Sequence, residues 1–314
     1  MEILVTGATG FIGREMVKEL AKNKEYHLKV ALRTVIKTQF APEIQVFSPF
    51  ELIAETNWQE ALSGTNLIIH AAARVHVLQE TGKNPLNEFR KINVEGTLNL
   101  ARQAAFSGVK RFIFISSIGV NGKSTLSNSP FTAEDLPNPH SPYAISKFEA
   151  EQQLQALAAE TGMDCVIIRP PLVYGPNSKG NFQRLLTLLQ TGLPLPLGAV
   201  YNKRSFVSLE NLLSLILLCV EHPRAANQIF LVSDDEDLST TELLKKIGKT
   251  INKPVRLIPI PQFILAWICS LLGKKALYER LCASLQINLS KTKEMLDWEP
   301  KKSLDEGLKT IFQD

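Results

Sequence analysis

Long hydrophobic runs are missing from this chain of 314 residues. Its two most apolar stretches, 212–220 and 263–272, fall short of the ~20 residues that span a bilayer. We therefore expect no stable membrane insertion. The second stretch, FILAWICSLLG, could lie on a membrane surface, but its composition favours a buried helix.

Other classes are excluded by what the sequence has little of. The four cysteines are scattered, with no C-x-x-C and no disulfide-like framework. No His, Cys, Asp or Glu cluster has metal-ligand spacing, so we expect no metal and an activity that survives chelation. The net charge of +4 is mild, and no basic run is interleaved with aromatics, which argues against nucleic-acid binding. The chain enters an apparent strand at once, leaving no room for a signal peptide, so it is expected to be cytoplasmic.

What is present is an alternation of short apolar runs and helical patterns. The predicted strands are 3–6, 28–32, 44–47, 67–70, 111–116 and 164–168, and the predicted helices are 11–23, 57–62, 84–107 and 142–161. This order predicts an α/β fold of the Rossmann type, a doubly wound parallel sheet with helices on both faces.

The pattern changes after Pro170. Helices dominate there, with short extended pieces near 205–207, 228–232 and 255–258 and loops at 176–181 and 194–198. The sequence thus predicts a dinucleotide-binding domain over 1–170. A smaller, mostly helical substrate lobe over 171–314 is expected to cover the carboxyl ends of the strands.

Three glycines connect the first strand to the first helix, in ILVTGATGFIGREMVKEL. Glycine disfavours both strand and helix, so three in seven positions need a special reason. Gly7 allows a tight turn, Gly10 lets the backbone approach a pyrophosphate, and Gly13 lets the helix pack closely on the strand. The free N–H groups at the helix start would bind the phosphates. The position of the motif predicts a dinucleotide site.

A second motif pairs a phenol with an amine. Tyr143 and Lys147 stand four residues apart on a predicted helix, so their side chains share one face. A phenol alone is a poor acid or base at pH 7, and a nearby ammonium favours the phenolate. Ser116 and Ser117, at the end of a neighbouring strand, could hold a substrate oxygen. The three elements together predict proton transfer at a hydroxyl or carbonyl.

With these motifs, the chain resembles the extended short-chain dehydrogenase/reductase family, and within it the nucleotide-sugar 4-epimerases and 4-ketoreductases. The resemblance covers nearly the whole chain. It rests on TGATGFIG (6–13), IIHAAA (68–73), NVEGTLNL (93–100), SS (116–117), YAISK (143–147), RPPLVYGP (169–176) and RSFVSLENL (204–212). LDWEP (296–300) has Asp297 where the family usually has glycine. AAARVHV (71–77) is most similar to bacterial polysaccharide-assembly members that act on UDP-linked sugars.

The resemblance implies a role for each matching residue. Tyr143 corresponds to the catalytic acid/base, Lys147 to the residue that tunes it and binds the nicotinamide ribose, and Ser117 to the serine at the reacting oxygen. Asn93 corresponds to an asparagine that helps to shape the site. The residues expected at the cofactor are Gly7, Thr9, Gly10, Phe11, Ile12, Gly13, Arg33, Ala71, Ala72, Ala73, Asn93, Tyr143, Lys147 and Pro170. Those expected at the substrate are His76, Ser117, Asn181, Arg204 and Arg280, where arginine suits a diphosphate.

The same residues serve two reactions, so the choice stays open at this point. An epimerase removes hydride from C4 and returns it to the other face, whereas a ketoreductase starts from a 4-keto sugar; we favour the epimerase. A 4,6-dehydratase is disfavoured because Ile118 and Gly119 stand where its carboxylates would be. A non-catalytic dinucleotide sensor is disfavoured by the retained tyrosine and lysine. The resemblance also implies a homodimer through the helices at 84–107 and 142–161.

The sequence favours NADP over NAD. An NAD site usually has an acidic residue about twenty positions after the last glycine, and Arg33 stands there. A guanidinium cannot accept hydrogen bonds from the ribose, but it can pair a 2′-phosphate, with Lys37 near enough to assist. The family's usual aspartate after the third strand is also absent, since Ser48 and Pro49 follow it. Arg33 could instead stack on adenine and tolerate either cofactor.

Overall fold

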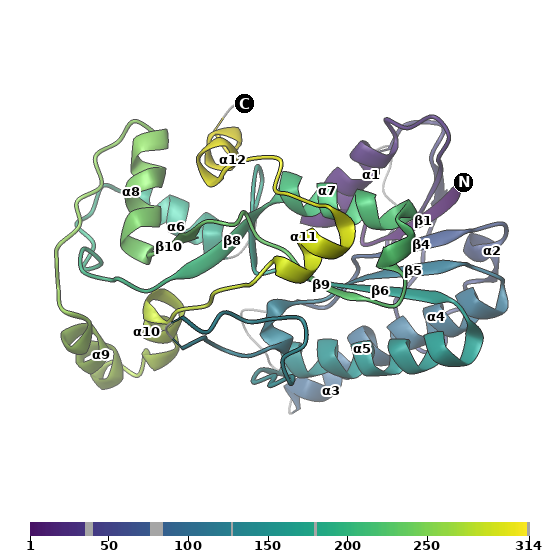
Figure 1. Ribbon diagram of the computed structural model, residues 1–314, viewed down its shortest axis with the longest axis horizontal. Coiled ribbons are helices and arrows are strands. Elements are labelled where there is room, and N and C mark those ends of the chain that lie inside the picture. The colour runs from purple at the N-terminus through teal and green to yellow at the C-terminus, as the bar shows by residue number, and fades with distance from the viewer. Residues whose placement is uncertain (35–39, 76–83, 127, 179–180, 313–314) are drawn as a thin grey trace.

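A seven-stranded parallel sheet forms the centre of the molecule, in a computed structural model that describes residues 1–34, 40–75, 84–126, 128–178 and 181–312 (Figure 1). In spatial order its strands are β3 (Gln45–Phe47), β2 (His27–Ala31), β1 (Glu2–Thr6), β4 (Leu67–His70), β5 (Arg111–Ile115), β6 (Asp164–Arg169) and β9 (Ile229–Leu231). Every neighbouring pair is parallel. The strand order reverses between β1 and β4, and ligands of such sheets bind at the carboxyl ends beside that point.

Helices cover both faces of this sheet (Figure 1). On one face lie α2 (Gln59–Leu62), α3 (Pro85–Arg90), a π-helical turn (Lys91–Gly96), α4 (Thr97–Phe106) and α5 (Pro142–Thr161). On the other lie α1 (Phe11–Leu20), α7 (Leu209–Glu221) and α11 (Ser290–Leu296). The α/β class and the doubly wound parallel sheet are confirmed.

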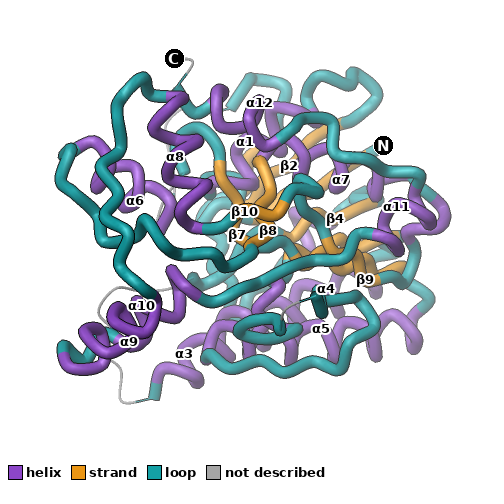
Figure 2. The backbone as a smooth tube through the Cα atoms, turned by 60° about the vertical axis from the view of Figure 1, so that its left-hand side comes forward, coloured by secondary structure: helices purple, strands orange, loops and turns teal. Residues whose placement is uncertain are grey.

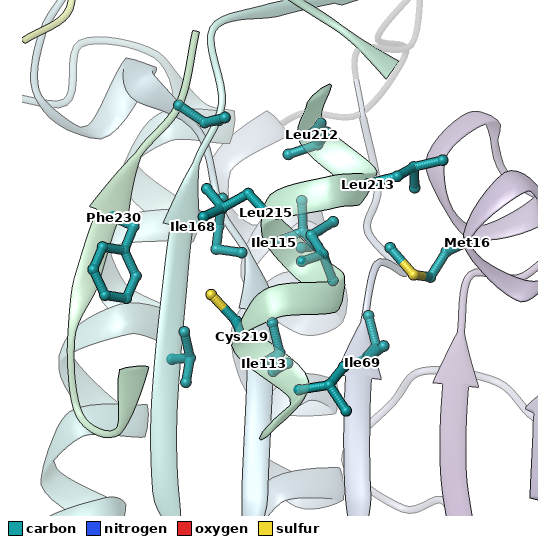
Figure 3. Close-up of a cluster of buried hydrophobic side chains, with 14 of the residues drawn as sticks. Met16, Ile69, Ile113, Ile115, Ile168, Leu212, Leu213, Leu215, Cys219 and Phe230 are labelled. Carbon is teal, nitrogen blue, oxygen red and sulfur yellow. The ribbon is translucent and has the colours of Figure 1, made fainter. Parts of the chain in front are cut away.

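The core between the sheet and α7 is built from branched aliphatic side chains (Figure 3). Ile69, Ile113 and Ile168 project from β4, β5 and β6 toward Leu212, Leu215 and Cys219 of α7. Strands covered on both faces read as continuous apolar runs, which explains why they are recognisable in the sequence. Burial on this scale makes the sheet a rigid platform for the loops at its carboxyl edge.

The smaller lobe has its own sheet (Figure 2). It also has its own hydrophobic core. Its strands run in the order β10 (Asp237–Leu238), β8 (Arg204–Ser208) and β7 (Leu172–Tyr174). Its helices are α6 (Asn181–Gln190), α8 (Thr240–Thr250), α9 (Gln262–Leu271), α10 (Lys275–Cys282) and α12 (Leu304–Thr310). Two 3₁₀ turns, Ile118–Val120 and Pro223–Ala225, complete the regular elements of the described chain.

Polar side chains cap several of these helices. Ser141 accepts a hydrogen bond from the backbone of Ala144 and Pro142 follows it, so α5 begins there. Ser239 and Glu242 form a capping box at the start of α8. Asp297 ends α11 with a left-handed φ of 52°. This conformation explains the glycine that the family usually has at this position.

The short extended piece expected near 255–258 forms an isolated bridge from Leu257 to Leu195. Two other details differ from the sequence-based expectations. β9 comes from beyond residue 170 yet joins the large sheet, and α7 packs on that sheet. The expectation that 263–272 is buried is wrong, because Leu265 is the buried residue of α9 and most of the others are exposed. Among the described residues, no helix is long and apolar enough to cross a membrane.

Candidate active site

A glycine turn joins β1 to α1 at the strand-order reversal. Gly7 has a φ of +71°, and a Cβ there would lie 2.6 Å from the Ala72 nitrogen. A Cβ on Gly13 would lie 2.3 Å from the Gly7 oxygen, so the helix packs directly on the turn. Gly10, at the N-cap, offers no side chain to the first turn of α1. The N–H groups of that turn remain available to an anion, as a bound diphosphate would require.

The other residues expected at the cofactor flank this turn. Phe11 and Ile12 open α1 half-buried, and Thr9 is exposed. Ala71, Ala72 and Ala73 follow β4, half-buried. Asn93, in the π-helical turn, supports their loop. Its carboxamide oxygen accepts from the Arg74 nitrogen at 2.8 Å, and its nitrogen donates to the Arg74 oxygen at 3.1 Å and to Ser146 of α5 at 3.0 Å. Asn93 is buried and therefore holds the alanine loop against α5.

Tyr143 and Lys147 lie on consecutive turns at the start of α5. Lys147 is 1% exposed, and its ammonium lies 4.0 Å from the centre of the Phe114 ring on β5. The Tyr143 ring meets Phe89 of α3 edge-on, with 6.1 Å between centroids. Burial lowers the pKa of Lys147 to about 7 and raises the pKa of Tyr143 to about 12. In the chain alone, therefore, burial opposes the phenolate that proton abstraction needs.

Ser117 caps the short 3₁₀ turn that follows β5. Its hydroxyl accepts a hydrogen bond from the Gly119 nitrogen at 3.1 Å. A Cβ added to Gly119 would lie 3.3 Å from the Ser117 hydroxyl oxygen and 3.4 Å from the Cβ of Ala144. The serine hydroxyl therefore stands beside the first turn of α5. Pro170, buried at the end of β6, accepts from the Ile118 nitrogen at 2.9 Å and closes the same corner.

A buried ion pair lies one turn further along α5. Glu151 and Arg169 are 1% and 2% exposed, and two guanidinium nitrogens of Arg169 reach the carboxylate, the closest at 2.6 Å. Ser116 also donates to Glu151, and Asn121 accepts from Arg169 at 2.9 Å. The negative charge of Glu151 works against the lowering of the Lys147 pKa. Neither residue was among those expected at the site, although Glu151 continues the four-residue spacing of Tyr143 and Lys147.

His70, at the end of β4, is a second buried polar group that was missed. Its ring lies between the hydroxyls of Thr6 and Thr97, at 2.8 and 3.0 Å, and stacks on Phe114 with 5.9 Å between centroids. Burial, with the charge of Lys147, lowers the pKa of His70 to about 3. The imidazole is therefore neutral near pH 7 and adds no charge beneath the lysine.

Three of the five residues expected at the substrate, Asn181, Arg204 and Arg280, come from the smaller lobe, whereas Ser117 follows β5 of the large sheet. Arg204, on β8, is half-buried, and its guanidinium donates to the oxygens of Arg280 and Ala283 at 3.2 and 3.0 Å. Desolvation lowers the Arg204 pKa, and no carboxylate in the described residues forms an ion pair with it. Arg280 is exposed at the end of α10. Asn181 begins α6, but its side chain and all of His76 lie outside the described residues.

Arg33 lies just after β2 and is exposed. Lys37, expected to assist it, falls outside the described residues. In the part of the chain that the structure describes, no group of three or more His, Cys, Asp or Glu side chains is placed to hold a metal ion.

Comparisons with known proteins agree with this geometry. Residues 3–233 match the model of the NAD dependent epimerase/dehydratase family. A UDP-glucose 4-epimerase of Vibrio cholerae is 45% identical over 99% of this chain and 94% of its own length. An N-acetyl-alpha-D-glucosaminyl-diphospho-ditrans,octacis-undecaprenol 4-epimerase of Escherichia coli O157:H7 is 26% identical, over 92% of this chain and 88% of its own.

A solved structure has the same fold. The UDP-glucuronic acid 4-epimerase of Bacillus cereus in complex with NAD superposes with a TM-score of 0.80 at 21% identity, over 99% of this chain and 96% of the other. The resemblance stated from the motifs is confirmed. The chain belongs to the NAD dependent epimerase/dehydratase family and is an enzyme of the extended short-chain dehydrogenase/reductase type.

Proposed function

We propose that this enzyme interconverts UDP-linked hexoses at C4. The observation that carries the proposal is the arrangement at the carboxyl edge of the large sheet: Lys147 is buried, Tyr143 is half-buried one turn before it, and the Ser117 hydroxyl lies beside the same turn of α5. The glycine turn after β1 lies at the same edge. The 45% identical relative is named a UDP-glucose 4-epimerase, which supports the substrate class.

In this proposal each side chain has a separate task. Tyr143 takes the proton from the sugar 4-hydroxyl and later returns it, while Ser117 holds the same oxygen. Lys147 lies one turn away and supplies positive charge that stabilises the phenolate. The glycine turn fits a dinucleotide, because it packs the first turn of α1 directly against the end of β1 and leaves the N–H groups of that turn without a side-chain cap. When bound, its nicotinamide supplies the acceptor and donor of the C4 hydride.

Product analysis separates the proposal from its alternatives. Incubation of the purified enzyme with UDP-glucose and a catalytic amount of NAD or NADP, each tested separately and followed by NMR, is expected to give a stable mixture of the two 4-epimers with no net change in cofactor. A 4-ketoreductase would instead consume reduced cofactor in proportion to a 4-keto sugar. Cofactor binding with no change in any UDP-hexose or 4-keto sugar would contradict the proposal and favour a sensor.

The finer cofactor preference is a separate proposal, that NADP binds more tightly than NAD. Arg33 follows β2 as an exposed cation at the position where an NAD site needs an acceptor. Titration calorimetry is expected to show the preference in the parent chain and its loss in Arg33→Asp. Lys24→Asp, an exposed charge change elsewhere, should leave it intact. Equal or tighter binding of NAD than of NADP by the parent chain would contradict a role of Arg33 in selecting the 2′-phosphate.

We also propose that residues 1–170 hold the dinucleotide and that residues 171–314 hold the substrate. The enzyme is proposed to be cytoplasmic.

A homodimer is a further proposal. A surface groove between the π-helical turn, α4 and α5 supports the dimer, since Arg90, Arg102 and Glu149 line it beside apolar Val94 and Leu98. Light scattering after size-exclusion chromatography is expected to give twice the mass of one chain; a monomer at all concentrations would contradict this.

A second candidate substrate is a hexose linked through diphosphate to a polyprenol. The E. coli relative is named for such a substrate, and α9 and α10 expose apolar side chains next to the segment that Arg204 binds. Incubation with N-acetylglucosaminyl-diphospho-polyprenol in detergent tests it. Conversion faster than that of UDP-N-acetylglucosamine would favour this candidate, and absence of conversion would remove it.

A further inference from the structure

Helix α9 presents an apolar face to solvent. Phe263, Trp267 and Leu271 follow one another at four-residue spacing and are 74%, 65% and 68% exposed. Leu272 is 63% exposed, and Leu277 of α10 is 47% exposed. We call these five residues the α9 face. Large exposed apolar patches on soluble proteins mark interaction sites.

The hairpin that carries this face is held firmly in the smaller lobe. Leu265 and Cys282, on its inner side, are buried in the lobe's core. Gly273 turns the chain with a φ of +64°, and the Lys274 nitrogen donates to the Cys269 oxygen at 2.7 Å. Figures 1 and 2 both show α9 and α10 side by side at the periphery of the molecule. The α9 face is therefore presented outward rather than loosely attached.

Positive charge borders the α9 face. Lys274, Lys275 and Arg280 are exposed around the turn and along α10. The carboxylate of this hairpin, on Glu279, forms an ion pair with Lys123 from another part of the chain. The hairpin thus offers net positive charge next to exposed aromatic and aliphatic groups. A negatively charged apolar partner complements it.

We propose that the α9 face docks on the surface of a bilayer that contains anionic lipid. Ten residues of helix span about 15 Å, half of the ~30 Å hydrocarbon core, so α9 would lie parallel to the surface. Tryptophan and phenylalanine insert at the headgroup level, while lysine stems extend along the apolar layer and their ammonium groups meet the phosphates.

A lipid surface fits this face better than a protein partner does. Lysine is depleted in protein–protein interfaces, whereas aromatic residues beside lysine and arginine are characteristic of helices that lie in membrane interfaces. The hairpin is also connected to the expected substrate site, because Arg204 donates hydrogen bonds to the backbone of Arg280 and Ala283 at the end of the hairpin. Docking would therefore bring the substrate lobe to the membrane.

The intrinsic fluorescence of the protein gives a direct test. Trp58 and Trp298 are buried at 2% and 3% exposure, so Trp267 is the exposed one of the chain's three tryptophans. We expect a blue shift and co-sedimentation with phosphatidylcholine–phosphatidylglycerol vesicles, both weakened by salt. Vesicles of phosphatidylcholine alone should bind about tenfold less, since the charge attraction is lost.

Variants identify the surface. Phe263→Ser/Leu271→Ser, which keeps Trp267 as the reporter, and Lys274→Glu/Lys275→Glu should each weaken vesicle binding by about tenfold or more. The matched control, Leu126→Ser/Leu136→Ser, removes two side chains that are 80% and 90% exposed elsewhere and should bind as the parent does. The turnover of UDP-hexose in solution should be unchanged in all three.

Three outcomes would overturn the proposal. They are no binding to anionic vesicles, binding that the α9 variants leave unchanged, and self-association without lipid that the α9 variants abolish, which would assign the face to a second copy of the chain. Since UDP-hexose turnover is measured separately and without lipid, failure of docking and failure of the proposed reaction are distinguishable.

Discussion

Helices α5 and α9 reverse the usual relation between composition and burial. α5 carries lysine, glutamate and serine along its length, yet Ser146, Lys147 and Glu151 are all buried. α9 has no charged residue in its ten positions, yet Trp267 and Leu271 are exposed. Burial in this protein is therefore decided by the partners that each element meets.

The partners of α5 make its polar groups tolerable. Glu151 has Arg169 and Ser116, and Lys147 has the face of Phe114. Buried charges are costly unless they are paired and hydrogen-bonded. α9 has apolar partners along one side, at Leu265, and solvent along the other. The buried polar groups of α5 are suited to proton transfer, and the exposed apolar side of α9 is suited to binding an external partner.

The largest expected effect comes from the phenol of α5. Tyr143→Phe should lower turnover by about 10²–10⁴-fold with nearly unchanged cofactor affinity, because the variant loses the proton-transfer group and keeps the ring. Steady-state kinetics and cofactor titration measure the two. Tyr278→Phe, which removes a hydroxyl from the α9–α10 hairpin, is the control and should retain turnover. Near-normal turnover in Tyr143→Phe would refute the proposed mechanism.

The buried ion pair should dominate stability on α5. Glu151→Gln leaves Arg169 buried without its counter-charge and should cost about 3–5 kcal/mol in the free energy of unfolding. The double variant Glu151→Leu/Arg169→Met removes both charges and should recover most of that loss. Urea denaturation at pH 7 measures both. A loss below about 1 kcal/mol in Glu151→Gln would mean that the carboxylate is not needed to keep the guanidinium buried.

Lys147→Met should inactivate the enzyme and stabilise it in a pH-dependent way. Burial lowers the Lys147 pKa from 10.5 to about 7, so between these values the unfolded chain binds a proton that the native chain does not. The native state of the parent is thus disfavoured progressively as pH falls from 10.5 to 7, by about 1.4 kcal/mol per unit, and the penalty is constant below 7. The gain in the free energy of unfolding of Lys147→Met over the parent should therefore grow as pH falls from 10.5 to 7 and stay constant below pH 7.

Denaturation of Lys147→Met and its parent at several pH values measures this advantage. Lys275→Met, at an exposed lysine of α10, is the matched control and should show no such trend. An advantage of Lys147→Met that does not change between pH 7 and 10 would contradict the shifted pKa.

The smallest effect on stability is expected at the α9 face. Trp267→Ser should change the free energy of unfolding by less than about 0.5 kcal/mol, because the side chain is mostly in solvent. Leu265→Ala, on the buried side of the same helix, should cost about 2–5 kcal/mol. Thermal or urea denaturation compares them. Equal losses in the two variants would show that Trp267 packs in the folded chain.

Much of the fold could be predicted because its signals are local. All six predicted strands are in the large sheet, within a few residues of their expected bounds. The predicted helix 142–161 is α5. The glycine turn was equally readable, since Gly7 needs its left-handed conformation and Gly13 its lack of a Cβ whatever the distant contacts. The roles of the site residues remain predictions, although the structure brings Ser117 beside the first turn of α5.

The missed features depend on segments that are distant in sequence. The Glu151–Arg169 pair with Ser116 joins α5 to the ends of β6 and β5, and its members are 18 and 35 residues apart. His70 is satisfied by threonines from β1 and α4. No local pattern reports which polar groups will meet in this way. The apolar composition of α9 predicted a helix buried on all sides. In the structure only the side that carries Leu265 packs in the core of the smaller lobe.

The sequence by itself determined the elements that backbone conformation and short-range spacing control: the alternating strands and helices, the glycine turn, and the placing of Tyr143 and Lys147 on one face of α5. Tertiary structure alone decided which charges are buried and which apolar side chains are exposed. The physical reason is that desolvation free energy depends on the atoms that replace water around a group. For Lys147 and Glu151 of α5 these atoms come from strands β5 and β6, and for the α9 face the described chain supplies none that cover it.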